Sequence, residues 1–201
     1  MAIKVFDKIL IQGINAGQIP ARTQQAREWF RKRARRSGTT TAGDITLKAE
    51  QDRLRGRPQI GKMYFYNYDP KFKNDNKVLP YYDIFPCVVI VDYTKDGWYG
   101  LNFHYLGLKE RATLLDALYN VTSDTRYDLA TRFRITYNML NTMSQFKEFR
   151  PTLKRYIASR VGNKIVEVFS SEWDIAMFLP VESFKKASAR KVWADSRKKI
   201  K

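Results

Sequence analysis

Few residues in this sequence have the side chains that enzymes commonly use for catalysis or for holding metals. His104 is its only histidine and Cys87 its only cysteine, whereas a zinc site needs several such ligands at close spacing. Cys87 lies in the most apolar stretch of the chain, so we expect both residues to be packed in the core rather than to act as a nucleophile and its base. No glycine-rich phosphate loop is present. The sequence therefore predicts a protein that is not an enzyme and has no cofactor, bound metal or small-molecule ligand.

Carboxylates offer an alternative chemistry, because acidic side chains at a sheet edge can hold Mg²⁺ in a nuclease. The acidic-x-Lys spacing usual in such enzymes is approached only by Asp69-Pro70-Lys71, whose proline indicates a turn. We expect the aspartates near the predicted strands to cap turns and protect sheet edges. A Mg²⁺-dependent nuclease is kept as a minor alternative. The aspartates concerned are Asp69, Asp83, Asp92 and Asp96.

Basic residues dominate the charge of the chain. It has 37 Lys and Arg against 20 Asp and Glu, a formal net charge of +17, and such an excess usually persists because a polyanion neutralises it. The segment 22–36 (RTQQAREWFRKRARR) predicts a helix capped by Thr23, with Arg27, Arg31 and Arg35 on one face. Guanidinium groups at one-turn spacing suit DNA phosphates. A solvated helix, or one that binds acidic protein, would have the same pattern.

No base-reading motif accompanies these residues, so we expect contact with double-stranded DNA that is independent of sequence. Tyr66, Tyr81, Tyr82 and Trp98 could stack on unpaired bases, although packing in the core or at its rim is the commoner role of such rings. The residues predicted to contact phosphates are Arg22, Arg27, Arg31, Lys32, Arg33, Arg35, Arg36, Lys154, Arg155, Arg160, Lys198 and Lys199.

The stretch 61–106 predicts the scaffold that positions these groups. Its first strand alternates, with Met63 and Phe65 on one face and tyrosines on the other. Residues 87–91 (CVVIV) are all apolar, as in a central strand that is covered on both sides. Asp96-Gly97 is a tight hairpin turn. Together these segments predict an antiparallel meander.

Apolar periodicity around this sheet predicts the helices. We therefore predict an α+β fold, whose antiparallel sheet could close into a small barrel and is covered by helices. Residues 1–60 would form a basic helical arm that is ordered only in an assembly or on a partner, and residues 61–201 an α+β body with a basic tail. Residues 164–169 alternate like a further strand. The predicted helices are 3–14, 22–36, 44–55, 109–121, 127–146, 151–162 and a segment from a cap at Ser170 or Ser171 to Pro180.

Nothing in the sequence indicates export or membrane insertion. The N-terminus has charged residues within its apolar run and no small-residue cleavage site, and no apolar run approaches the length that spans a membrane. A single cysteine excludes a disulfide within the chain. We expect synthesis in a reducing, cytoplasmic compartment.

Several separated strings of the sequence resemble one protein family. They are GQIPARTQQAREWFRKRA, GKMYFYNYDPKFK, LPYYDIFPCVVIVDY, GWYGLNFHYL, WDIAMFLPVESFKKA and VWADSRKKI. They are similar to the DNA end-protector proteins of large contractile-tailed, T-even-like bacteriophages. One departure from the family is Gly107-Leu108, where proline is expected.

The resemblance implies a virion structural protein that is made late in the host cytoplasm. It would bind and protect the end of the packaged double-stranded DNA near the head–tail junction, beside other virion proteins of the neck or tail. The strings are also compatible with a neighbouring neck, tail or baseplate protein of the same phages, whose basic arms would bind acidic subunits. In this context the nuclease alternative becomes a head-completion nuclease.

Overall fold

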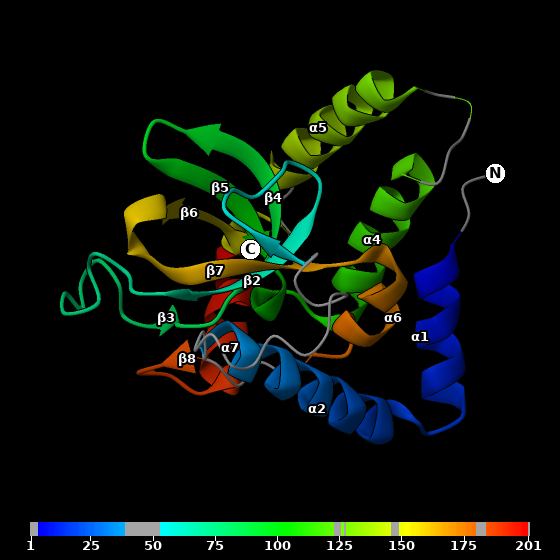
Figure 1. Cartoon of the computed structure of the whole chain (residues 1–201). Coiled ribbons are helices and arrows are strands. Elements are labelled where there is room, and N and C mark those ends of the chain that lie inside the picture. The colour runs from blue at the N-terminus through cyan, green and yellow to red at the C-terminus, as the bar shows by residue number, and fades with distance from the viewer. Residues whose placement is uncertain are drawn as a thin grey trace.

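The protein folds around a main antiparallel sheet. The computed structural model describes residues 4–38, 53–122, 126, 128–145, 149–179 and 184–200. Within them the strands of this sheet lie in the order β1-β7-β2-β4-β5-β6 (Figure 1), and a separate short ladder pairs β3 with β8. The strands are β1 Leu54–Arg55, β2 Met63–Tyr68, β3 Tyr82–Asp83, β4 Cys87–Thr94, β5 Gly97–Asn102, β6 Leu153–Ile157, β7 Val161–Val168 and β8 Phe184–Lys185.

The α+β class is confirmed, but the sheet is not closed into a barrel. β6 and β7 are joined only by the 3-10 helix η3 (Ala158–Arg160), although β2, β4 and β5 lie between them in the sheet. Main-chain bonds from Asp69 N to Arg160 O (3.0 Å) and from Ala158 N to Asp96 O (2.8 Å) hold this end together. The sheet is therefore strongly curled at this end, while β1 and β6 remain the edges of its described part.

The predicted alternation of β2 is confirmed. Met63 and Phe65 belong to the larger core cluster, on one face of the sheet, and Tyr64 and Tyr66 to a second cluster on the other. Residues 87–91 of β4 divide between the same two clusters and are fully or almost fully buried. An apolar run without alternation thus marks a strand that is covered on both faces.

Helices cover both faces of the sheet. Four of them add side chains to the larger cluster, while α5 adds Leu140 to that cluster and Tyr137 to the other. The helices predicted at 109–121 and 127–146 are confirmed as α4 and α5. The helices are α1 Val5–Asn15, α2 Ile19–Gly38, α4 Leu108–Thr122, α5 Leu129–Gln145, α6 Trp173–Ala176 and α7 Ala189–Ile200, with the 3-10 helices η1 Phe103–Tyr105, η2 Arg150–Thr152 and η4 Ser170–Glu172.

The N-terminal helix α1 docks on α4 of the same chain. Phe6 and Leu10 are buried in the larger cluster. Asp116 of α4 accepts hydrogen bonds from the amides of Phe6 (2.8 Å) and Asp7 (3.1 Å). Because the first amides of a helix have no partner within it, a carboxylate from another helix here acts as the cap and also meets the positive end of the helix dipole.

Helix α2 begins before the predicted segment, so Thr23 lies within it and is not its cap. Trp29 and Phe30 dock the helix as predicted: their rings lie 5.4 and 4.9 Å from that of Phe65. In the predicted helix 44–55, residues 44–52 lie outside the described residues, and residues 54–55 form β1 instead. The division into an arm and a body at residue 60 stays a prediction.

The helix predicted at 151–162 is wrong. These residues form η2, β6 and η3 before β7 begins. β6 pairs with β5, and Tyr156, which lies opposite Trp98, is buried in the second cluster. Gly97 permits the close approach of β5 and β6, because a Cβ at this position would lie 1.9 Å from the carbonyl oxygen of Tyr156. Burial of Tyr156 and the ladder with β5 outweigh a local pattern that also fits a helix.

Arg111 of α4 is buried in the larger core and binds backbone carbonyls from two distant segments. Its Nε donates to the carbonyls of Phe103 and Leu106, both at 3.0 Å. Its Nη1 donates to those of Met177 (3.0 Å) and Leu179. Burial lowers the pKa of the guanidinium to about 10. One side chain therefore fixes both ends of η1 and the turn that follows α6.

We expect Arg111→Met to destabilise the fold by at least about 2 kcal/mol, because it leaves several buried carbonyls without a donor. Urea unfolding of the full chain measures this change. Lys109→Met is the matched control, since Lys109 is exposed on the same helix. Equal unfolding midpoints for the two variants would contradict the role assigned to Arg111.

Asp116→Ala should cost about 1 kcal/mol, the usual value of a helix cap, and should loosen α1 selectively. Hydrogen exchange is the measurement: the amides of Phe6 and Asp7 should exchange faster, while those of β4 keep their protection. Asp174→Ala, at an exposed position of α6, serves as the control. Unchanged exchange in α1 would show that apolar packing alone holds this helix.

Candidate nucleic-acid interface

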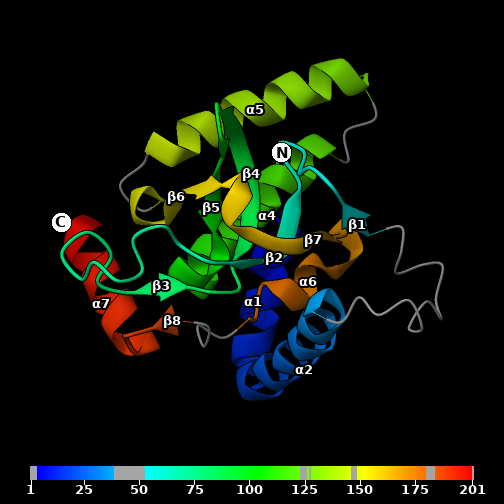
Figure 2. The ribbon, with the colours of Figure 1, turned by 60° about the vertical axis from the view of Figure 1, so that its left-hand side comes forward.

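A cleft of about 350 Å³ opens between the segment 68–83, β6 and η1. Figure 2 shows β3 and β8 beside α7, on the side of the sheet away from β1. The lining combines aromatic rings with basic side chains at the rim. It consists of Tyr68, Pro70, Lys71, Phe72, Val78, Leu79, Pro80, Tyr81, Tyr82, Asp83, Asn102, Tyr105, Lys154, Arg155, Tyr156 and Ile157.

One wall of the cleft is a packed aromatic group. The ring centroids of Tyr81 and Tyr105 lie 6.5 Å apart, and Phe184 of β8 packs edge-on against both, at 6.0 and 4.8 Å. Val192 of α7 is buried behind them. Tyr81 is brought here because β3 pairs with β8 directly after it. The rings are thereby fixed before any ligand arrives.

The floor of the cleft is a buried hydrogen-bond network centred on Asp83. Its Oδ2 lies 2.5 Å from Nδ1 of His104 and accepts from Nδ2 of Asn102 (3.1 Å). Its Oδ1 accepts from the amide of Phe85 (3.0 Å), and Asn102 also donates to the hydroxyl of Tyr156 (3.2 Å). Both carboxylate oxygens of Asp83 therefore have hydrogen-bond partners inside the protein, as a buried carboxylate requires.

Both residues that were expected to pack in the core do so. His104 is buried and contacts Asp83. Cys87 is fully buried in the larger cluster, and burial raises the pKa of its thiol well above the usual value. A thiol in that state is a poor nucleophile.

Cations surround the mouth of the cleft. Nζ of Lys154 lies 4.2 Å from the ring centroid of Tyr105, a cation–π contact that holds the ammonium over the face of this ring. Arg155 forms two hydrogen bonds with Asp96, of 2.7 and 2.9 Å. Arg160 lies farther out, 3.9 Å from Asp69. All of these ion pairs at the rim are largely exposed, so they are weak and a phosphate can compete with them.

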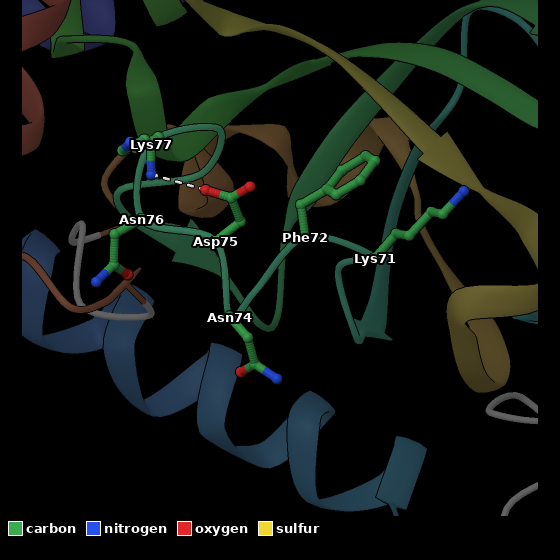
Figure 3. A pocket seen from close by; sticks show the side chains of 6 residues that line it. All are labelled: Lys71, Phe72, Asn74, Asp75, Asn76 and Lys77. Atoms are coloured by element: carbon green, nitrogen blue, oxygen red, sulfur yellow. Dashed lines mark hydrogen bonds between the residues drawn. The ribbon is translucent and has the colours of Figure 1, made fainter.

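The loop 71–77 extends the cleft into a shallow hollow of about 620 Å³ (Figure 3). Its six lining side chains are polar or basic apart from Phe72, which is 49% exposed. Asp75 shapes the loop by accepting from the amide of Lys77 (2.9 Å). Lys186 anchors it to the segment after β8 by donating to the carbonyl of Lys73 (2.6 Å). The hollow and the cleft share Lys71 and Phe72.

Comparison with known proteins identifies the family. The model of the family described as phage T4 terminal DNA protecting protein matches residues 3–196. The chain belongs to this family. A search of curated proteins and a search of solved structures each found no match. The resemblance that the sequence strings carried is thus confirmed, and the chain is a bacteriophage protein of the kind that protects DNA ends.

The structure brings only part of the predicted phosphate-binding set together. Lys154 and Arg155 line the cleft, and Arg160 lies beside it. Arg22 and Arg27 lie elsewhere, on α2: Arg22 stacks over the ring of Phe178 at 5.3 Å, and Arg27 donates to Gln24 at 3.3 Å. Arg31 on α2 and Lys198 on α7 are exposed. The side chains of Lys32, Arg33, Arg35, Arg36 and Lys199 lie outside the described part of the structure.

Of the candidate stacking rings, Tyr81 and Tyr82 line the cleft. Tyr66 and Trp98 are instead buried in the second core cluster, where Trp98 Nε1 donates to the hydroxyl of Tyr66 (3.1 Å). Lys71 also lines the rim, although it was not among the residues predicted to contact phosphates. Its signal was the alternation of lysine with Phe72 directly after Asp69-Pro70, which is unusual for a loop that is only polar.

The aspartates considered for a nuclease have partners within the protein. Asp92 accepts from the hydroxyl of Tyr137 (3.1 Å) and from the amide of Tyr93 (2.7 Å). Asp83 accepts a hydrogen bond from Asn102, and Asp96 accepts one from Arg155. No group of three or more metal-binding side chains is found among the described residues. In that part of the chain there is also no helix of the length and hydropathy needed to cross a membrane.

The tyrosines around the cleft and beneath it predict a loss of stability at alkaline pH. Burial raises the pKa of several of them above the ordinary value of 10.0, that of Tyr64 to about 12. A phenol whose pKa is higher in the folded state than in the unfolded state contributes stability that is lost as the pH rises above 10. The residues with raised pKa values include Tyr64, Tyr66, Tyr68, Tyr81, Tyr105 and Tyr156.

We therefore expect an ultraviolet tyrosinate titration in which these side chains ionise only as the protein unfolds above pH 10. The same titration in concentrated guanidinium chloride is the control, and there all 12 tyrosines should ionise together near their ordinary pKa. A native protein that gave the same curve as the denatured one would contradict the burial of these phenols.

Proposed function

We propose that this protein binds the ends of the phage's linear double-stranded DNA, independently of sequence, and protects them from exonucleases. The observation that carries the proposal is the cationic rim of the aromatic cleft, in a chain of net charge +17 that belongs to a DNA-protecting family. Lysine and arginine that replace condensed counterions on DNA supply an affinity that does not depend on sequence. Protection of the ends then requires binding alone, without a chemical reaction.

The mechanism is steric and electrostatic. The rim residues Lys71, Lys154 and Arg155 hold backbone phosphates near a strand terminus, and Arg155 exchanges its exposed partner Asp96 for a phosphate. The folded body then occupies the space that an exonuclease needs to engage the terminus. The chain breaks no bond and acts as a structural protein of the virion.

Helix α2 supports a second contact with the duplex. Its 20 residues extend for about 30 Å, and its exposed Arg31 faces solvent beyond the docking residues Trp29 and Phe30. Together the rim and α2 would track the backbone on one side of the DNA end.

We further propose that the protein sits near the head–tail junction, against other neck or tail proteins. The outer face of α1 supports such a contact, because Ile11 and Ile14 are 49% and 57% exposed on a helix whose other face is fully docked. Exposed apolar side chains that lie close together are typical of protein interfaces. In the competing proposal of a tail or baseplate assembly protein, the basic rim would bind acidic subunits instead.

The test is equilibrium binding to linear duplex with open ends and to the same duplex closed covalently at both ends, over a series of salt concentrations. We expect tighter binding to open ends and a logarithmic salt slope of about −0.9 per phosphate contact. Lys71→Gln with Lys154→Gln should flatten the slope by about 2. Lys109→Gln, on the exposed side of α4, should leave it unchanged.

Two outcomes would contradict the proposal. Weak binding that is equal on both DNAs and lost at physiological salt would mean that the charge serves protein assembly, and the tail or baseplate proposal would replace this one. Cleavage of DNA in the presence of Mg²⁺ or Mn²⁺, abolished by Asp83→Ala or Asp92→Ala, would make the protein a nuclease.

A further inference from the structure

We propose that the aromatic cleft binds a single unstacked nucleotide at the terminus of a DNA strand, and that this contact makes binding specific for ends. The inference rests on the proposed function, DNA-end binding, and names the part of the end that is recognised. It assigns the cleft one occupant: a terminal base against the partly buried ring of Tyr82, with its flanking phosphate on the cationic rim.

Phosphate contacts alone cannot distinguish an end from the interior of a duplex. The charge spacing is the same along the whole DNA, so lysines and arginines bind any stretch of it. The distinctive feature of an end is its last base, which is stacked on one side only. Unstacking a base costs a few kcal/mol within a duplex and least where it is already poorly held. A pocket for an unstacked base therefore selects ends.

The size and shape of the cleft suit such an occupant. Its volume of about 350 Å³ falls in the range of pockets that enclose small ligands, and its walls are preformed. Tyr81 and Tyr105 are held by Phe184 and Val192 behind them. Tyr82 also lines the cleft and is only partly buried. An intact duplex, in contrast, presents base edges and not ring faces, so it cannot use these rings.

The charge around the cleft fits a nucleotide rather than an apolar ligand. Lys71, Lys154 and Arg155 line the rim, against Asp83 as the acidic residue of the lining. The ammonium of Lys154 is already held at the cleft by its contact with the face of the Tyr105 ring. A base on the wall would thus have an ammonium beside its phosphate. Phe72, which is 49% exposed at the mouth, extends the apolar surface toward the next base.

The floor of the cleft explains how this pocket can bind without reading sequence. Asp83 accepts from three groups of the protein itself, and both contacts of Asn102 Nδ2 are internal. Little hydrogen-bonding capacity remains to distinguish the edges of different bases. Stacking, which every base can provide, then dominates, and the cleft accepts any terminal nucleotide.

The first experiment measures the ratio of affinities for open-ended and covalently closed duplex in Tyr82 variants of the full chain. Tyr82→Ala should reduce that ratio at least about fivefold, because a base–aromatic stack is lost, and should leave binding to closed DNA unchanged. Tyr82→Phe keeps the ring and should keep the ratio. Tyr99→Ala is the matched control: Tyr99 is a 40% exposed tyrosine on β5 that does not line the cleft.

The second experiment uses the unaltered protein, so it tests whether the terminal nucleotide lies in the cleft even if a variant folds poorly. A duplex with 5-iodouracil as its terminal nucleotide is cross-linked by light, and the linked peptide is identified by mass spectrometry. We expect cross-links to the peptides that contain Tyr81, Tyr82 or Tyr105. The same probe placed several nucleotides inside the duplex should give none there.

The outcomes separate this inference from the proposed function. A wild-type protein that prefers open ends, but keeps that preference in Tyr82→Ala and cross-links outside the cleft, would overturn the inference and leave the proposed function standing. A wild-type protein without any preference for open ends would overturn both. Loss of preference in Tyr82→Ala alone, together with terminal cross-links in the cleft, would support the inference.

Discussion

The guanidinium of Arg111 is buried in the larger core and donates hydrogen bonds to four backbone carbonyls. It holds the carbonyls at both ends of η1 and those of the turn after α6, two segments that are far apart in the sequence. Burying a charge is costly, and the pKa of Arg111, lowered to about 10, reflects that cost. The cost is offset because one rigid fork supplies donors to carbonyls of two separate segments.

The position of η1 determines part of the candidate site. This short helix presents His104 and Tyr105, the first to Asp83 in the floor of the cleft and the second to its wall. β6 pairs with β5 and brings Lys154, whose ammonium lies over the Tyr105 ring, and Arg155 to the rim. The cleft is thus assembled from the ends of several elements. Its rings are rigid because the core behind them is rigid, which lowers the entropy cost of binding.

Charge and shape have separate roles in this arrangement. In the proposed function, the basic surface would give affinity for DNA in general, and that affinity would fall steeply with salt. The inferred pocket for an unstacked base would add the distinction between an end and the interior. A protein with only the first property would coat DNA, whereas one with only the second would bind ends too weakly to resist an exonuclease. The proposed combination would account for end protection by binding alone.

Much of the fold follows from local pattern. The alternation of Met63 and Phe65 with tyrosines, the apolar run in β4 and the periodicity of α4 and α5 each report which faces of an element are buried, and such information is local. The sequence strings also indicated the end-protector family, and the positive charge indicated a polyanion such as DNA as partner. Trp29 and Phe30 were recognised as docking residues for the same reason, since both lie on one edge of a helix.

The segments that these faces contact are set by pairing between distant parts of the chain. Residues 153–157 fit a helix locally, yet they form β6 because the ladder with β5 and the burial of Tyr156 stabilise a strand. The cap of α1 comes from Asp116, more than 100 positions along the chain, and no local signal predicts such a partner. The cleft likewise joins Lys71 to Lys154 across the sheet. A sequence pattern determines how one element is built, whereas long-range pairing determines which side chains share a site.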